Sequence, residues 1–188
     1  MTIEKGQEWG RVVSERTAGV PCVGDLAAEV GIDETNDEPI NPPQSWRELP
    51  LDVLEVTLTT RGGAETCVDT HLGVIAGRKY LGNFLLASSL SFVSGRRIFT
   101  RAHPNDGKLD WLMIPSSMPT RQRLAFFRRT RLGDHLPHPA VSSGSAVTFS
   151  HEFARPVRVR VNERSISGVT KINVRVRPDG THTYIPAL

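Results

Sequence analysis

The sequence has no uninterrupted apolar run that approaches the ~20 residues a helix needs to span a bilayer. Its opening residues, MTIEKGQEWG, contain no hydrophobic core of the kind found in secretory signals. Only two cysteines, Cys22 and Cys67, occur in 188 residues, and their spacing fits neither a metal site nor a disulfide scaffold. We therefore expect a protein of the reducing cytoplasm, without a transmembrane segment.

Phosphate-binding loops and aromatic residues are also scarce. No Walker-type GxxxxGK[ST] motif occurs, and the pair Gly62-Gly63 is too short to cradle a nucleotide. Without such a cradle a kinase mechanism has no donor site, so no ATP is expected to bind. Aromatic residues make up 6% of the chain, and no RNP-like strand motif is present. This disfavours an RNA-binding module.

Charge is distributed unevenly along the chain. The net charge is +3, but residues 29–55 are acidic and proline-bearing, whereas arginines accumulate from Arg96 onward. An uneven charge of this kind attracts nucleic acid, phosphate-bearing ligands or an anionic membrane surface. A solvated, arginine-rich surface is the alternative, and both interpretations stay open at this stage.

Residues 1–50 are predicted to form a loosely structured arm. Within it, Asp25 to Gly31 has the pattern of a short helix, with Asp25 capping its start and Gly31 ending it. The following polar segment carries Pro39, Pro42 and Pro43, which predicts a linker.

Residues 51–188 are predicted to form a β-rich domain. The strands are expected in residues 52–60, 67–75, 83–92, 109–114, 147–153, 156–161, 170–178 and 182–186. In residues 157–161 and 174–177 valine alternates with arginine, so valine is expected to face a core and arginine to face water or a ligand. Turns are expected at 162–168 and at Pro178-Asp-Gly.

Pro119 to Leu132 is the clearest helix, and Gly133 ends it. Either Phe126 and Phe127 insert into lipid or stack on nucleic acid, or Leu124, Phe127 and Leu132 pack on the sheet while the arginines are solvated. Strands do not alternate with helices, which disfavours a doubly wound fold. The predicted fold is therefore α+β and β-rich, an antiparallel β-sandwich-like domain with one main helix and the N-terminal arm.

The segment Arg101 to Asp110, RAHPNDGKLD, contains a turn that exposes Asp106 beside a glycine. Such a turn can bind a hard cation through its carboxylate and nearby carbonyls, or it can be a plain β-turn. Its neighbours follow in the order apolar strand, basic helix, HLPHPAV, strands and PVRVRVNERSISG, and VGDLAAEVGI lies upstream. Over Val23 to Ile185 this order resembles the C-terminal domain of bacterial diacylglycerol-kinase-like lipid kinases.

The resemblance implies that Asp106, with the carbonyls of Lys108 and His103, holds a structural Mg²⁺. It also implies that Asp25 is the acidic residue next to the nucleotide, although Gly24 replaces the family's asparagine. In the catalytic hairpin, Asn162 and Arg164 cannot act as a base, because asparagine accepts no proton and arginine stays protonated. Glu163 is the one candidate base, and it needs a one-residue register shift, so the base is expected to be lost.

The chain is therefore interpreted as a non-catalytic relative of a lipid kinase that binds a lipid or phosphate-bearing ligand, or a partner protein. Asp25, Arg158 and Arg160 are the candidate ligand-binding residues. The alternatives are a lipid kinase half that borrows a separate ATP-binding partner, and an arginine-rich nucleic-acid-binding module, which the scarcity of aromatics disfavours. Peripheral membrane contact stays open. A homodimer is expected, because the surface that the family buries against its nucleotide domain would otherwise be exposed.

Overall fold

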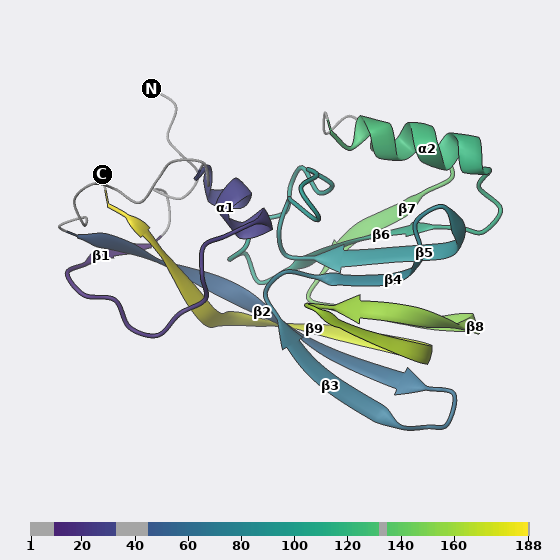
Figure 1. Cartoon of the computed structure of the whole chain (residues 1–188), viewed down its shortest axis with the longest axis horizontal. Helices are drawn as coiled ribbons and strands as arrows, with labels where there is room; N and C mark the ends of the chain where they lie inside the picture. Colours follow the sequence, from purple (N-terminus) through teal and green to yellow (C-terminus); the bar gives the residue numbers. More distant parts are fainter. Residues whose placement is uncertain (1–9, 33–44, 132–134, 188) are drawn as a thin grey trace.

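The computed structural model describes residues 10–32, 45–131 and 135–187, which form one extended antiparallel sheet with two helices (Figure 1). The elements are β1 (Arg11–Val13), α1 (Asp25–Val30), β2 (Trp46–Thr60), β3 (Glu65–Thr70), β4 (Val74–Arg78), β5 (Leu81–Ser88), β6 (Leu109–Ile114), α2 (Thr120–Arg129), β7 (Ser142–Ala146), β8 (Thr148–Val161) and β9 (Arg164–Pro186). The predicted α+β, β-rich class is confirmed. Neither helix of the described ranges has the length and apolar content needed to cross a bilayer.

The strands follow the order β1-β2-β9-β8-β4-β5-β6-β7, and β3 pairs with the other edge of β2. The sheet bends between β8 and β4, so that β4 to β7 lie over β2, β8 and β9 (Figure 1). Both halves contribute to one apolar cluster, with Leu58 and Val174 from one half and Leu85 and Leu109 from the other. This shared core gives the sandwich-like arrangement expected from the sequence.

A second core lies on the opposite face of β4 to β6, where α2 covers the sheet. Phe126 and Phe127 of α2, each 2% exposed, pack with Phe84, Leu86 and Leu112 of β5 and β6. Burial of a phenylalanine side chain contributes roughly 1.5–3 kcal/mol, so α2 is held firmly. Insertion of these two rings into lipid is therefore excluded.

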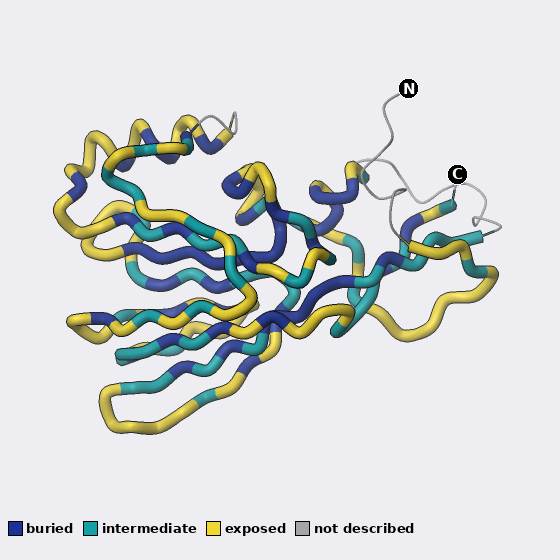
Figure 2. Tube along the Cα trace, turned by 180° about the vertical axis from the view of Figure 1, so that it is seen from behind, coloured by how far each residue is buried: buried dark blue, intermediate teal, exposed yellow. Residues whose placement is uncertain are grey.

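The sheet-packing interpretation of α2 is correct for Phe127 and wrong for Leu124, which is 43% exposed. Figure 2 shows the outer side of α2 exposed and its inner positions buried. Leu132 and Gly133, where the helix was expected to end, lie outside the described residues, and the helix itself ends at Arg129.

The short helix α1 packs against the sheet through two small clusters. Leu26 contacts the cluster of Leu51 and Leu90, and Val30 lies with Leu49 and Ile185. Gly31 ends the helix in the left-handed conformation, as predicted (φ 77°). The predicted N-cap is wrong, because Gly24 occupies the cap position and Asp25 binds elsewhere. The proline-rich linker with Pro39, Pro42 and Pro43 lies outside the described residues.

Two interruptions predicted in the C-terminal strands are absent. Each strand continues across the predicted break because it pairs with a long neighbouring strand on both sides of it. Residues 147–153 and 156–161 merge in β8, and Pro178-Asp-Gly lies inside the continuous strand β9. At Pro178-Asp-Gly the chain forms a bulge opposite β2, where Asp179 takes a positive φ of 51°. Conversely, residues 67–75 divide into β3 and β4 before and after the turn at Gly73. The turn of 162–168 shortens to two residues, since Val161 pairs with Arg164.

Candidate functional site

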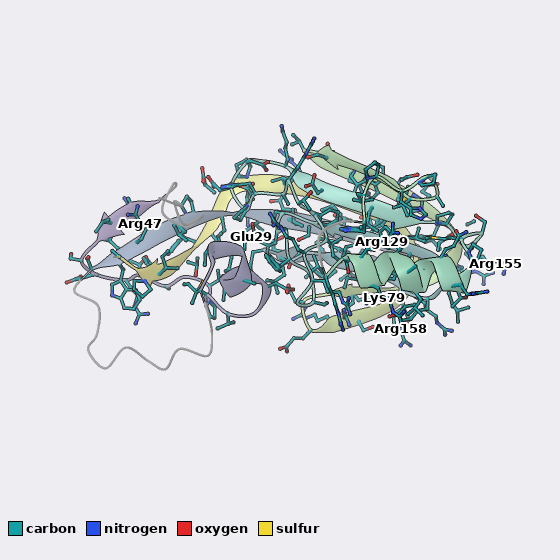
Figure 3. The ribbon with its side chains drawn as sticks, turned by 90° about the horizontal axis from the view of Figure 1, so that it is seen from above. Glu29, Arg47, Lys79, Arg129, Arg155 and Arg158 are labelled. Carbon is teal, nitrogen blue, oxygen red and sulfur yellow. The ribbon has the colours of Figure 1, made fainter. Side chains whose placement is uncertain are left out.

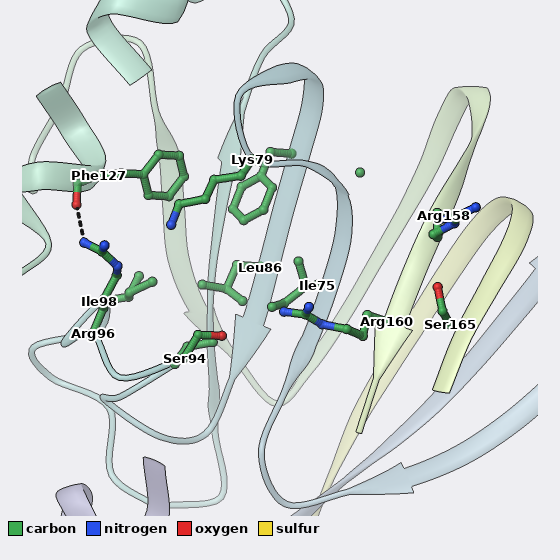
Figure 4. A pocket seen from close by; sticks show the side chains of 13 residues that line it. Ile75, Lys79, Leu86, Ser94, Arg96, Ile98, Phe127, Arg158, Arg160 and Ser165 are labelled. Atoms are coloured by element: carbon green, nitrogen blue, oxygen red, sulfur yellow. Dashed lines mark hydrogen bonds between the residues drawn. The ribbon is translucent and has the colours of Figure 1, made fainter. Parts of the chain in front are cut away.

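An open cleft of about 610 Å³ lies between β4–β5, the loop after β5, α2 and the β8–β9 hairpin (Figure 4). We call it the basic cleft. Its apolar lining comes from the sheet, the loop and α2, and consists of Ile75, Phe84, Leu86, Val93, Ile98 and Phe127. Its cationic lining consists of Lys79, Arg96, Arg158 and Arg160. Apolar and cationic side chains therefore line one hollow.

The arginines of β8 reach the cleft because of the alternation of valine and arginine. Val159 and Val161 are fully buried in the main core, so Arg158 and Arg160 lie on the opposite side of the strand. Arg160 stands opposite Ile75 of β4, and Figure 4 shows its guanidinium extending toward that side chain. The prediction that valine faces the core and arginine faces outward is confirmed.

Lys79 lies at the turn of β4–β5 and points over α2. Its Nζ is 4.6 Å from the centroid of the Phe127 ring, which is within cation–π range. Burial lowers the pKa of Lys79, and the nearby charges of Arg96 and Arg131 lower it further. An anion bound beside Lys79 would offset both effects.

Arg96 comes from the loop after β5 and joins that loop to α2. Its Nη1 donates a hydrogen bond to the carbonyl of Phe127 at 2.8 Å and contacts the hydroxyl of Thr130 at 3.5 Å. Sequence reasoning missed both Lys79 and Arg96 as site residues. The only signal was the arginine-rich RRIFTR segment, which does not reveal that its first arginine meets α2.

No carboxylate among the described residues forms an ion pair with the cations of the basic cleft. The ion pairs of the described surface join Arg11 to Glu48, Lys171 to Glu152, and Arg177 to Glu55 and Asp69. Within the cleft, Arg158 donates only to the hydroxyl of Ser167, at 3.3 Å. The cleft therefore carries positive charge that the described side chains do not neutralise.

Asp25 lies at the border of the cleft, in an adjoining hollow that shares Ile75, Ser94 and Arg160 with it. Its two carboxylate oxygens accept the backbone N–H groups of Ser94 and Gly95 at 2.6 and 2.7 Å. Both of these residues have positive φ, 53° and 69°, which turns their N–H groups toward the carboxylate. Asp25 therefore positions the loop that lines the cleft.

Asn162 and Glu163 form the turn of the β8–β9 hairpin. Asn162, with φ 53°, accepts a hydrogen bond from Thr70 Oγ1 at 2.5 Å and donates to the carbonyl of Asp69 at 3.2 Å. Glu163 is exposed at the turn and does not line the basic cleft. The structure thus places Arg158 and Arg160 in the basic cleft and Asp25 in the adjoining hollow, and Glu163 lines neither.

The turn of Asp106 also lies outside the basic cleft, against β2 and β9. The buried Asp52 carboxylate accepts the N–H groups of Gly107 at 2.7 Å and Asp179 at 3.3 Å. Asp106 Oδ1 accepts the N–H of Lys108 at 3.0 Å, which leaves Oδ2 for a cation. That the carbonyls of Lys108 and His103 complete a Mg²⁺ site with Asp106 stays a prediction. No group of three or more His, Cys, Asp or Glu that suits a metal occurs in the described ranges.

The chain is similar in part to two solved structures. Both are described as a "putative diacylglycerol kinase" from Bacillus anthracis str. Sterne, and both are 10% identical to this chain. The similarity to one has a TM-score of 0.35 and covers 69% of this chain and 39% of that structure's chain. The similarity to the other has a TM-score of 0.37 and covers 72% of this chain and 55% of that structure's chain. This chain thus spans less than two thirds of either structure. No protein-family model and no curated protein matches the sequence.

The basic cleft has the composition of a binding site for an amphipathic anion. Guanidinium groups bind phosphate or carboxylate oxygens through paired N–H donors, whereas the apolar lining excludes water and accommodates hydrocarbon. Among the described residues that line the cleft, none is an aspartate, a glutamate or a histidine, and Asp25 at its border already accepts two N–H groups. The described geometry is therefore suited to binding.

Proposed function

We propose that this protein binds a lipid with a phosphate headgroup in the basic cleft and does not itself transfer phosphate. The observation that carries the proposal is the juxtaposition of four cationic side chains with an apolar lining, without a carboxylate partner among the described residues. A phosphate would supply the missing negative charge. The acyl part would lie against Ile75, Leu86 and Phe127.

The two parts of the cleft favour this ligand over a simpler one. A free inorganic anion would leave the apolar side chains in contact with water, and a neutral lipid would leave the cations uncompensated. The resemblance of the sequence order to lipid kinases agrees with a lipid as the ligand class. Binding without catalysis is supported by the position of Glu163 at the hairpin turn and by the lack of a phosphate-binding loop in the sequence.

Isothermal titration calorimetry tests the proposal. Dioctanoyl phosphatidic acid, held below its aggregation concentration, is compared with dioctanoylglycerol and with inorganic phosphate. We expect the phosphatidic acid to bind at least about tenfold more tightly than either, since each lacks one of the two kinds of contact. Equal binding of dioctanoylglycerol, or no binding of the phosphatidic acid, would overturn the proposal.

Variants locate the binding in the cleft. Arg160→Gln and Lys79→Met are each expected to weaken phosphatidic acid binding by about tenfold, the effect of removing one charge-assisted contact. The matched control is Arg175→Gln, an exposed arginine on β9 that does not line the cleft. Equal losses in all three variants would show that only the general positive charge matters.

A transfer assay separates binding from catalysis. Labelled ATP, Mg²⁺ and dioctanoylglycerol are incubated with the pure protein, and no labelled lipid is expected. Transfer that is abolished by Glu163→Gln would show that the chain is a kinase, with Glu163 as its base. Transfer only after addition of a second polypeptide would show a kinase half that borrows its ATP-binding domain.

A further inference from the structure

Three large apolar side chains are exposed on two neighbouring elements outside the basic cleft. Tyr80 and Leu81, at the turn of β4–β5, are 42% and 61% exposed, and Leu124 on α2 is 43% exposed. Exposed apolar side chains that gather in one place mark a contact surface more often than scattered ones do.

The turn and the helix are in direct contact around Phe127. The ring of Tyr80 meets the ring of Phe127 edge to face, with centroids 5.8 Å apart. Leu124 precedes Phe127 by three positions and therefore lies beside it on the helix. Arg123 ties the two elements together, since its Nη2 donates to the carbonyl of Gly82 at 2.5 Å. Tyr80 and Leu124 therefore both lie next to Phe127, and Leu81 follows Tyr80 in the chain. We call these three residues the turn–helix surface.

This surface is surrounded by positive charge. Residues 76–88, 111–131 and 153–162, which supply the turn, the helix and the facing part of β8, contain no aspartate or glutamate. On α2, Arg121 and Arg128 lie three residues before and four residues after Leu124, which places them on its side of the helix. Seen from above the helix, Lys79 lies beside α2 and Arg155 lies beyond its end (Figure 3).

We propose that the turn–helix surface docks on an anionic lipid bilayer. Leucine and tyrosine side chains flanked by arginine are the composition of interfacial membrane contacts, in which apolar groups enter the headgroup boundary and cations meet lipid phosphates. A nucleic acid would satisfy the arginines and leave both leucines in water. Lys79 belongs to the basic cleft and adjoins Tyr80, so the cleft opens next to the docked surface.

Vesicle co-sedimentation tests the docking. Vesicles of phosphatidylcholine alone are compared with vesicles that also contain phosphatidylglycerol. We expect binding to the mixed vesicles that weakens as salt is raised, and at least about tenfold weaker binding to the neutral ones. The double variant Leu81→Ser/Leu124→Ser is expected to lose about tenfold in partitioning. The control Val147→Ser, at a residue that is 54% exposed between β7 and β8, is expected to bind like the wild type.

The charge variant Arg121→Gln/Arg128→Gln gives a second readout, because it is expected to flatten the salt dependence. Equal sedimentation of the leucine variant and the wild type would overturn the proposal, as would equal binding to neutral vesicles. Salt-dependent binding of double-stranded DNA without vesicle binding would show a nucleic-acid surface instead.

The docking is distinguishable from the proposed function of the cleft. Soluble dioctanoyl phosphatidic acid requires no membrane, so its affinity for Leu81→Ser/Leu124→Ser should match that for the wild type. Arg160→Gln should bind the soluble lipid about tenfold more weakly and still sediment with phosphatidylglycerol vesicles. If Leu81→Ser/Leu124→Ser loses both soluble phosphatidic acid binding and vesicle binding, the turn–helix surface and the cleft are not separate sites, and the proposal is overturned.

Discussion

Arg96 donates a hydrogen bond from its guanidinium to the backbone carbonyl of Phe127 at 2.8 Å, and so fastens the loop after β5 to α2 (Figure 4). Phe127 lies near the C-terminal end of α2, where carbonyl groups carry partial negative charge. One contact therefore stabilises both the helix end and one wall of the basic cleft.

Substitution of Arg96 should weaken the fold as well as the cleft. Arg96→Met is expected to lower the free energy of unfolding by about 1–2 kcal/mol, since a charged hydrogen bond to the helix end is removed. Urea denaturation measures the change. The neighbouring Arg97→Met is the control, because Arg97 is exposed and does not line the cleft. Similar losses in both variants would show that the bond to Phe127 contributes nothing.

The affinity for a phosphate lipid should depend on the protonation of Lys79. Burial and the charges of Arg96 and Arg131 lower the pKa of Lys79 in the free protein, and a bound phosphate would raise it again. Between these two pKa values binding takes up a proton, so affinity falls as pH rises. Titration calorimetry from about pH 8 upward avoids the second phosphate ionisation near pH 6. Lys79→Arg, which stays protonated, should show a flat profile, and a flat wild-type profile would contradict the assignment.

The two residues of the β8–β9 turn should respond differently to substitution. Asn162→Ala removes the bonds to Thr70 and Asp69 and puts alanine at a positive φ, so a loss of about 1–2 kcal/mol of stability is expected. Glu163→Ala should change stability by less than about 0.5 kcal/mol, because Glu163 is exposed. Thermal unfolding of the two variants measures the contrast. A large loss for Glu163→Ala would reveal a contact that the turn geometry does not contain.

The buried carboxylate of Asp52 should make stability depend on pH. It accepts the N–H groups of Gly107 and Asp179, so Asp52→Ala is expected to cost about 2 kcal/mol. Burial raises the pKa of Asp52 above 3.8, and the charges of Asp106 and Asp179 add to this. The folded state thus holds the proton to higher pH than the unfolded chain, and the contribution of Asp52 falls as pH rises through its folded pKa.

Denaturation of the wild type and Asp52→Ala between about pH 4 and pH 7 measures this effect. The stability difference between the two proteins should be largest at the acid end. A difference that grows toward pH 7 would mean that the two N–H groups lower the pKa of Asp52 more than burial raises it. The exposed Glu65→Ala serves as the control for general charge effects.

The Mg²⁺ implied at Asp106 can be tested by thermal unfolding. A cation bound at ten times its dissociation constant stabilises a folded protein by about 1.4 kcal/mol. Addition of millimolar Mg²⁺ is therefore expected to raise the melting temperature of the wild type by a few degrees and to leave Asp106→Ala unchanged. The same shift in both proteins would place any Mg²⁺ effect elsewhere.

Local pattern was sufficient for much of the fold. The strand at Leu109–Ile114 has the bounds expected from its apolar run, and Gly31 ends α1 as expected. The local pattern was insufficient where contacts with residues far away in the sequence override a local turn or cap motif. Pro178-Asp-Gly is a strong turn motif, but β2 pairs with β9 on both sides of it, and Asp52 accepts the N–H of Asp179. Aspartate is a favoured helix N-cap residue, yet the Asp25 carboxylate instead accepts the backbone N–H of Ser94 in the loop after β5.

The sequence by itself determined that Arg158 and Arg160 leave the core, because neighbouring residues of a strand face opposite sides and the alternating valines take the apolar side. Only the tertiary structure decided that these arginines share a cleft with Lys79 and Arg96. These two residues come from separate segments and meet through Phe127, which α2 carries over the sheet. A one-dimensional pattern records which face a side chain takes within its own strand. Which other segment it then meets depends on how the sheet bends and where the helix packs.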